Sequence, residues 1–367
     1  MKIVLDAMGG DHAPGVVIDG AVQAARELGG DRAPGDEIIL VGREDVVRHE
    51  LGRALKGADP AGLGLSVVHA DEVIEMDEHV DAVKRKQNAS IRVGMRMVHE
   101  GQADAFVSAG NSGAVMASAI FDLHRIRGIK RPALAVMYPA APAPVLLIDN
   151  GANTDPTPEN LVQFAQMGAT YVERVWGIQN PRVAIVSNGE EPDKGNELVR
   201  ATFPLLQASG LNFVGNAEGK DVTKGIADVV VVDGFTGNVM IKLSEGLVSF
   251  LARYIKNELT GGALNKLGLA LAVPGLILAL PGFALLIPSL LRIARRMDYA
   301  EYGGAPLLGV DGVVIIAHGR SNAKAIKNAI RVARDSVNVD LVGVIKQSVA
   351  SKSQAESQET RTTNNHG

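Results

Sequence analysis

The chain has 367 residues, of which 46% are hydrophobic and 21% are charged, and its formal net charge is −4. This composition is typical of one large or two smaller globular domains with a substantial core, and it excludes a disordered chain. The negative charge argues against general binding to nucleic acid, and the absence of cysteine excludes disulfides, thiol nucleophiles and cysteine-ligated metal sites.

Apolar, β-branched runs along the chain predict strands, and amphipathic stretches of helical length lie between several of them. The predicted strands are Lys2–Leu5, Glu37–Val41, Leu65–His69, Ala105–Val107, Val145–Ile148, Val183–Val186, Asn212–Gly215, Val229–Val232 and Val313–Ala317. The predicted helices include Gly15–Leu28, Ser112–Arg127, Pro158–Val175 and Glu197–Ser209. This alternation predicts an α/β fold with a largely parallel sheet and helices on both faces.

Most of the predicted strands end in a cluster of Gly, Asp, Asn or His residues. The clusters span residues 6–12, 108–113, 149–153, 187–196, 233–238 and 317–321. The carboxyl ends of parallel strands bring such loops together, so we expect one shared ligand pocket, although the same residue types also form ordinary turns.

The loop 108–113 precedes a predicted helix that Asn111 or Ser112 can cap. Its backbone N–H groups and the positive end of the helix would form a site for phosphate or an oxyanion, and the alternative is a simple capped turn. The loop 233–238 repeats this design before a helix that starts near Val239. Two such loops favour an anionic ligand.

Three further groups of residues have both a functional and an ordinary interpretation. Asp6, Asp11 and His12 can bind a metal, orient a neighbouring loop, or act as acid and base, whereas a single histidine is usually structural or solvated. Lys194, in a glycine-containing loop, can direct a positive charge into the pocket or remain on the surface. The basic run 84–86 is either a solvated helix face or a cationic rim.

Between Lys266 and Arg292 the chain has 25 residues without a charge, and prolines interrupt them every seven residues. This segment, 267–291, can form a kinked apolar hairpin in the inner leaflet, a helix pair in a dimer, or a transmembrane helix. We favour the hairpin because the three prolines would disrupt a spanning helix. The polar tail 347–367 is predicted to be disordered.

Taken together, the motifs resemble those of the bacterial phosphate acyltransferase (PlsX) family, from Met1 to about Val344. The matching segments are 6–14, 69–74, 108–114, 131–135, 194–198, 233–238, 302–306 and 317–319. The chain differs from the expected family pattern in an uncharged, proline-rich tip and in Ser112, where threonine is expected. There is no Walker A motif, no GxGxxG after a strand, no HExxH and no GxSxG, which disfavours the enzyme classes that use them.

The resemblance implies a three-layer α/β/α fold like that of isopropylmalate dehydrogenase and phosphotransacetylase, with one catalytic domain (1–346) and an apolar helical tip (262–297). It also implies an enzyme that forms acyl-phosphate from acyl-[acyl carrier protein] and inorganic phosphate, early in phospholipid synthesis, with no metal and no cofactor. The alternatives are a phosphotransacetylase-like enzyme that uses acyl-CoA and a non-catalytic membrane scaffold for lipid-synthesis enzymes.

The family motifs and the loop positions together suggest the site residues. The catalytic candidates are Lys194, Asn238, His12 and Asp11. The substrate-binding candidates are Asp6, Gly9, Gly10, Gly110, Asn111, Ser112, Gly113, Asn153, Asn196, Gly234, Thr236, Gly237 and His318. The candidates for docking the acidic carrier are Lys84, Arg85, Lys86, Arg292, Arg295 and Arg296.

The resemblance also implies the partners of the chain. These are acyl carrier protein and a second copy in a homodimer. The apolar segment 267–291 adds the inner-leaflet membrane surface and a membrane glycerol-3-phosphate acyltransferase that accepts the product. The expected localisation is cytoplasmic, with peripheral attachment to the membrane.

Overall fold

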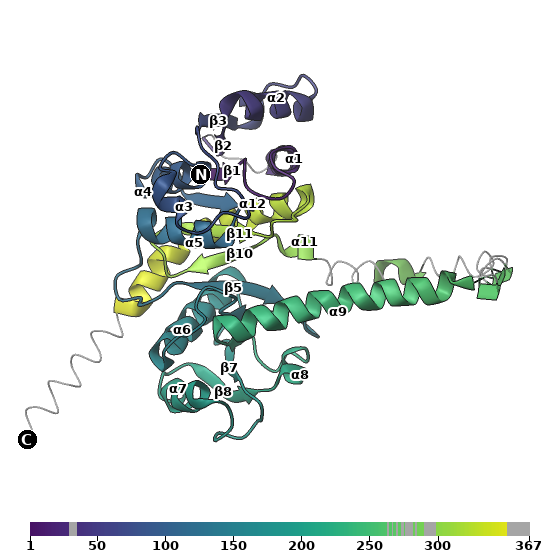
Figure 1. The fold of residues 1–367 in the computed structure, drawn as a ribbon. Coiled ribbons are helices and arrows are strands. Elements are labelled where there is room, and N and C mark those ends of the chain that lie inside the picture. The colour runs from purple at the N-terminus through teal and green to yellow at the C-terminus, as the bar shows by residue number, and fades with distance from the viewer. Residues whose placement is uncertain are drawn as a thin grey trace, which may run out of the picture.

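The structure is a computed structural model that describes residues 1–28, 35–262 and 299–350, with isolated residues and short runs between 264 and 289. It is organised around a mixed sheet in the order β3-β2-β1-β4-β11-β10-β5-β6-β9-β7-β8 (Figure 1). The strands are β1 (Lys2–Asp6), β2 (Glu37–Gly42), β3 (Leu65–His69), β4 (Ala105–Ser108), β5 (Ala133–Tyr138), β6 (Val145–Ile148), β7 (Arg182–Val186), β8 (Asn212–Ala217), β9 (Val229–Val231), β10 (Gly304–Leu308) and β11 (Val313–Ala317).

The sheet is mostly parallel, as the alternation of strands and helices predicts, but its direction reverses in the middle. β10 pairs antiparallel with both β11 and β5, and β5 pairs antiparallel with β6. The strands β1, β2, β3, β4 and β11 therefore run one way, and β6, β7, β8 and β9 run the other way. Loops that follow the two sets of strands consequently leave the sheet at opposite ends.

Helices cover both faces of the sheet and complete the expected three layers. The α-helices are α1 (Gly15–Leu28), α2 (Glu44–Leu55), α3 (Ala82–Arg85), α4 (Ser90–His99), α5 (Ser112–Ser118), α6 (Pro158–Val175), α7 (Glu197–Gln207), α8 (Gly219–Val222), α9 (Gly234–Thr260), α11 (Tyr299–Tyr302) and α12 (Ala323–Asn338). The structure also has a 3-10 turn, η1 (Ala61–Leu63), and a π-helical turn, η2 (Ala119–Leu123). α1, α2, α12, α6 and α7 pack on one face, whereas α4, α5, α8 and α9 pack on the other.

Strand residues alternate between the two faces, which fixes the two apolar layers. In β5, Ala133 and Ala135 belong to the core beneath α6, and Leu134 belongs to the core beneath α4 and α5. At the starts of α5, α7, α9 and α12, polar side chains accept hydrogen bonds from the first free N–H groups. Thr157 and Asn160 form a capping box at α6, which confirms the start predicted at Pro158.

The predicted tip lies mostly outside the described residues. α9 extends away from the sheet and ends at Thr260 (Figure 1). Among the described residues, no helix combines the length and the apolar character that crossing a bilayer requires. Most of 267–291 and residues 292–297 lie outside the described part of the chain. The tail prediction needs one correction, because residues 347–350 are helical; residues 351–367 are not described.

Candidate active site

The polar loops form two groups rather than one pocket, which corrects the sequence-based expectation. The reversal of strand direction at β10 and β5 is the physical reason. The first group, loops 6–12, 108–113 and 317–321, follows β1, β4 and β11. The second group, loops 149–153, 187–196 and 233–238, follows β6, β7 and β9.

In the first group, Asp6 organises the loops from inside the protein. Its carboxylate is fully buried, accepts a hydrogen bond from Ser108 Oγ at 2.7 Å and another from the Met8 backbone N–H at 3.1 Å. Burial raises the pKa of the Asp6 carboxyl. Gly9 packs against Gly110 so closely that a Cβ at Gly9 would lie 2.7 Å from the Gly110 nitrogen. Asp6, Gly9 and Gly110 therefore shape the loops, and Asp6 has no exposed surface with which to touch a substrate.

Asn111 is the cap of α5, as one of the two sequence alternatives predicted. Its Oδ1 accepts a hydrogen bond from the Ala114 N–H at 3.1 Å, and its Nδ2 donates to the carbonyls of Met76 and Glu78, each at 3.0 Å. Ser112 and Gly113 form the first turn of α5. The side chain of Asn111 thus fixes loop 108–113 to the segment that precedes α3.

The titratable candidates of this group are exposed at the edge of the sheet. Asp11 donates its backbone N–H to the Gly319 carbonyl at 2.8 Å, and His318 Nδ1 accepts a hydrogen bond from the Arg320 N–H at 3.1 Å. His12 and His318 are both exposed. A polar cavity of about 440 Å³ adjoins Gly10 and Asp11.

In the second group, Asp149 has the role that Asp6 has in the first. It is fully buried and accepts hydrogen bonds from the Leu134 N–H at 2.8 Å and from both the backbone N–H and the side-chain amide of Asn153, at 2.6 and 2.9 Å. Burial raises the pKa of its carboxyl. Asn153 is itself 5% exposed, so its side chain serves this internal network.

Two glycines bring the start of α9 against this network. A Cβ at Gly237 would lie 2.0 Å from the Asp149 carbonyl oxygen, and one at Gly234 would lie 2.6 Å from the Asn153 carbonyl oxygen. The same close packing places the half-buried Asn238 beside Gly151, where a Cβ would lie 3.7 Å from Asn238 Cβ.

Two capped helix starts lie at one cavity of about 470 Å³ at the ends of β7 and β9. Asp233 caps α9 by accepting a hydrogen bond from the Thr236 N–H at 2.9 Å, and Asn196 caps α7 by accepting one from the Val199 N–H, also at 2.9 Å. Asn196 and Thr236 both line the cavity. The side chain of Asn196 therefore holds the helix as well as facing the cavity.

Lys194 is exposed on a loop that several hydrogen bonds hold in place. Asn216, at the end of β8, donates from Nδ2 to the Glu191 carbonyl at 2.6 Å, and Asn188 Oδ1 accepts a hydrogen bond from the Gly195 N–H at 2.8 Å. The sequence analysis did not identify Asn216. The available signal was its position directly after the predicted strand Asn212–Gly215, where the other polar strand-end residues also lie.

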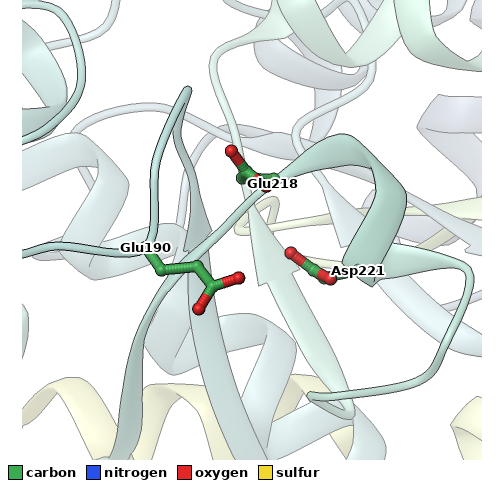
Figure 2. Close-up of side chains that lie close together, drawn as sticks. All are labelled: Glu190, Glu218 and Asp221. Atoms are coloured by element: carbon green, nitrogen blue, oxygen red, sulfur yellow. The ribbon is translucent and has the colours of Figure 1, made fainter.

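Three carboxylates lie close together where this loop meets the start of α8 (Figure 2). Glu190 on the loop and Glu218 and Asp221 at α8 have oxygens within 4.8 Å of one another. Lysines neutralise them: Lys220 Nζ pairs with Glu218 and lies 3.9 Å from Glu190, and Lys224 Nζ lies 2.8 Å from Asp221. We therefore interpret the cluster as an ion-pair network that ties loop 187–196 to α8.

The candidate docking residues have different environments. Lys84 and Arg85 are exposed, and the Lys84 ammonium lies 6.0 Å from the centre of the Phe121 ring. Lys86 points inward and donates to the Val73 carbonyl at 2.5 Å and to Glu78 Oε2 at 2.6 Å. Its charge is therefore used within the protein, which leaves Lys84 and Arg85 as the exposed pair. The other candidates, Arg292, Arg295 and Arg296, lie outside the described residues.

Comparison with known proteins shows a family relationship over nearly the whole chain. Residues 1–343 match the family described as "Fatty acid synthesis protein". The phosphate acyltransferase of Heliobacterium modesticaldum is 49% identical over 353 residues, which cover 96% of this chain and 98% of that protein. The phosphate acyltransferase of Pelotomaculum thermopropionicum is also 49% identical, over 352 residues and 96% of each chain.

Solved structures share the fold at low sequence identity. A phosphotransacetylase from Streptococcus pyogenes superimposes with a TM-score of 0.59 and 16% identity, covering 92% of this chain and 94% of that one. The EutD phosphotransacetylase from Staphylococcus aureus gives 0.53 and 16%, covering 91% and 94%. These similarities confirm the fold class that the sequence resemblance implied.

Proposed function

The chain belongs to the fatty acid synthesis protein family, and we propose on this basis that it transfers the acyl group of acyl-[acyl carrier protein] to inorganic phosphate. The observation that carries this function is the match to relatives named phosphate acyltransferase, which extends over 96% of the chain at 49% identity. The strand-end loops of the structure supply polar groups and helix N-termini, which can stabilise the negative charge that develops on the thioester carbonyl oxygen during acyl transfer.

The reaction is a balanced substitution at a carbonyl carbon. An oxygen of hydrogen phosphate forms a bond to the thioester carbonyl carbon, the carbon–sulfur bond breaks, and the phosphate proton ends on the released thiol. The leaving thiol has a pKa of about 8.5, so it leaves with little help from an acid. The protein therefore has to position the two substrates and stabilise the negative charge that develops on the carbonyl oxygen.

We assign the central roles to the second group of loops. Lys194 is an exposed cation on a loop held by Asn216, and it neutralises phosphate or the developing oxyanion. Asn238 lies directly after the first turn of α9, beside the loop that Asp149 organises, and holds a reacting oxygen. His12 and Asp11 belong to the first group, whose loops leave the sheet at the opposite end, so we assign them no proton-transfer step and infer that they shape a surface for the carrier substrate.

The function is tested by mixing the purified protein with palmitoyl-[acyl carrier protein] and phosphate. We expect thiol release that depends on phosphate, and one acyl-phosphate, trapped by hydroxylamine as the hydroxamate, for each thiol released. Palmitoyl-CoA serves as the competing donor. Thiol release without acyl-phosphate, or equal efficiency with palmitoyl-CoA, would contradict the assignment.

We also propose membrane and dimer contacts, which the exposed apolar side chains of α9 and the uncharged sequence after it support. Leu243, Leu247, Phe250 and Tyr254 on α9 are each more than half exposed, and the uncharged segment 267–291 follows this helix. We assign the tip to the inner-leaflet surface and α9 to a homodimer, with a membrane acyltransferase accepting the product. Deleting 267–291 is expected to abolish liposome flotation while turnover in solution continues; unchanged flotation would contradict this assignment.

A further inference from the structure

The cavity at the ends of β7 and β9 has a lining that differs from a phosphate site. Apolar side chains from three elements form its wall, with Leu161 from α6, Ile185 from β7 and Val199 from α7 among them. Ser187, Asp233 and Thr236 contribute polar groups. This combination of an apolar wall and a few polar groups is typical of sites for organic ligands.

The charge of the lining disfavours an anion inside the cavity. Asp233 contributes a carboxylate, and among the described residues that line the cavity there is no lysine, arginine or histidine. A phosphate dianion placed there would be repelled by Asp233 without a compensating cation. A neutral group such as a thioester with its alkyl chain meets no such repulsion.

The size of the cavity leads to the same conclusion. Its volume is about 470 Å³. One water molecule occupies about 30 Å³ of liquid, and a phosphate ion is only a few times larger. A single phosphate ion would therefore leave most of this space empty. An alkyl chain would fill the space and bury its own surface against Leu161, Ile185 and Val199, which is favourable.

One polar side chain in the cavity wall lacks a hydrogen-bond partner. Ser187 lines the cavity, and its Oγ is buried and makes no hydrogen bond to any described residue. Gly195 lies close by, where a Cβ would approach Ser187 Oγ to 3.3 Å. A buried hydroxyl without a partner is unfavourable, and rotation of the Ser187 side chain toward the cavity would let the carbonyl oxygen of a bound thioester supply the missing acceptor.

We propose that this cavity is the acyl subsite of the reaction, and that Ser187 donates a hydrogen bond to the thioester carbonyl oxygen. The apolar wall receives the alkyl chain of the acyl group, so a longer chain fills more of the cavity, and the phosphate binds outside, where Lys194 is exposed on the same loop. This inference rests on the proposed function. It assigns Ser187 a hydrogen bond and no bond-making step.

The wall is tested by Val199→Phe, which fills the cavity, and by Leu205→Phe, an exposed position on the same helix that does not line it. Steady-state rates are measured with butyryl-, octanoyl- and palmitoyl-[acyl carrier protein]. We expect Val199→Phe to lower kcat/KM for the palmitoyl substrate at least tenfold more than for the butyryl substrate, with KM for phosphate within twofold of wild type. Leu205→Phe should leave the chain-length profile unchanged.

The Ser187 hydroxyl is tested with separate variants. These variants still test the acyl subsite if the Val199→Phe protein fails to fold. Ser187→Ala is expected to lower kcat about tenfold without raising KM for phosphate, and Ser187→Thr, which keeps a hydroxyl, should recover most of the loss. A selective rise in KM for phosphate in either cavity variant would overturn the acyl subsite and make the cavity the phosphate site. Equal losses for all chain lengths would also overturn it. Failure of the wild-type protein to form acyl-phosphate would instead overturn the proposed function itself.

Discussion

The side-chain amide of Asn216 donates a hydrogen bond to the backbone carbonyl of Glu191 at 2.6 Å, and this bond joins the end of β8 to the loop that carries Lys194. Asn216 is only 6% exposed, so the bond is shielded from water. A residue that touches no substrate thereby fixes the position of the proposed phosphate-binding cation.

Replacing Asn216 by alanine should loosen this loop and lower kcat/KM several-fold, with a loss of stability of about 1 kcal/mol for one hydrogen bond. Asn212→Ala is the matched control, because Asn212 makes a similar bond to the Asn180 carbonyl at the other end of the same strand. Steady-state kinetics and urea unfolding measure both effects. Equal kinetic losses in the two variants would indicate a general effect of strand β8.

Lys194→Ala should lower kcat/KM for phosphate about a hundredfold or more, because a positioned charge that faces a developing anion is removed. Lys194→Arg should retain part of the activity, since the charge remains. Lys130→Ala, an exposed lysine outside both loop groups, is the control. Full turnover by Lys194→Ala would exclude the assigned role.

Gly237→Ala should destabilise the protein by about 1–3 kcal/mol, because the added Cβ would lie 2.0 Å from the Asp149 carbonyl oxygen and force the first turn of α9 away. Gly246→Ala on the same helix has open space around the added Cβ, and it should be neutral or slightly stabilising. Thermal unfolding compares the two variants. The same melting temperature for both would show that the tight approach of α9 is absent in solution.

The sequence predicted most of the fold, and the part that it missed is informative. α1 and α6 have the predicted bounds, and nearly all parallel strands were located by their apolar, β-branched runs. β5 and β10 were missed, because β5 contains Ala133 and Ala135 and β10 contains Gly304 and Pro306, and alanine, glycine and proline are all depleted in strands.

This omission explains the wrong expectation of a single pocket, since β5 and β10 are the strands at which the sheet changes direction. Loop composition located most of the polar groups at the strand ends. It did not distinguish Asp6, which is buried and organises the loops, from exposed residues such as Lys194, because burial depends on contacts distant in sequence.

Asp6→Asn should change the pH dependence of stability. Burial raises the pKa of the Asp6 carboxyl above its unfolded value of about 3.9. The contribution of this pKa shift to the free energy of unfolding is therefore fully present below about pH 3.9. The contribution is lost as the pH rises through the folded pKa. The stability of wild type relative to Asp6→Asn should therefore decrease as the pH rises from about 4, as measured by urea unfolding at several pH values. A difference that grows with pH would contradict this sign.

Removing one partner of the ion pair between Arg92 and Asp122 should lower the free energy of unfolding strongly. The two side chains are 12% and 6% exposed, and two hydrogen bonds join them, at 2.5 and 2.8 Å. Asp122→Ala leaves a largely buried guanidinium without its partner and should cost about 3–5 kcal/mol. Glu44→Ala, which breaks an exposed pair with Arg48, should cost at most about 1 kcal/mol. Urea unfolding compares them, and similar losses would contradict the buried geometry.

The most direct test of the function is transfer of radiolabelled phosphate from solution into the acyl product. The protein is incubated with palmitoyl-[acyl carrier protein] and labelled phosphate in the presence of EDTA. The account predicts labelled acyl-phosphate together with an equal amount of free carrier thiol. No label in the acyl product while palmitoyl-[acyl carrier protein] remains intact, or label only after a divalent metal is restored, would contradict it.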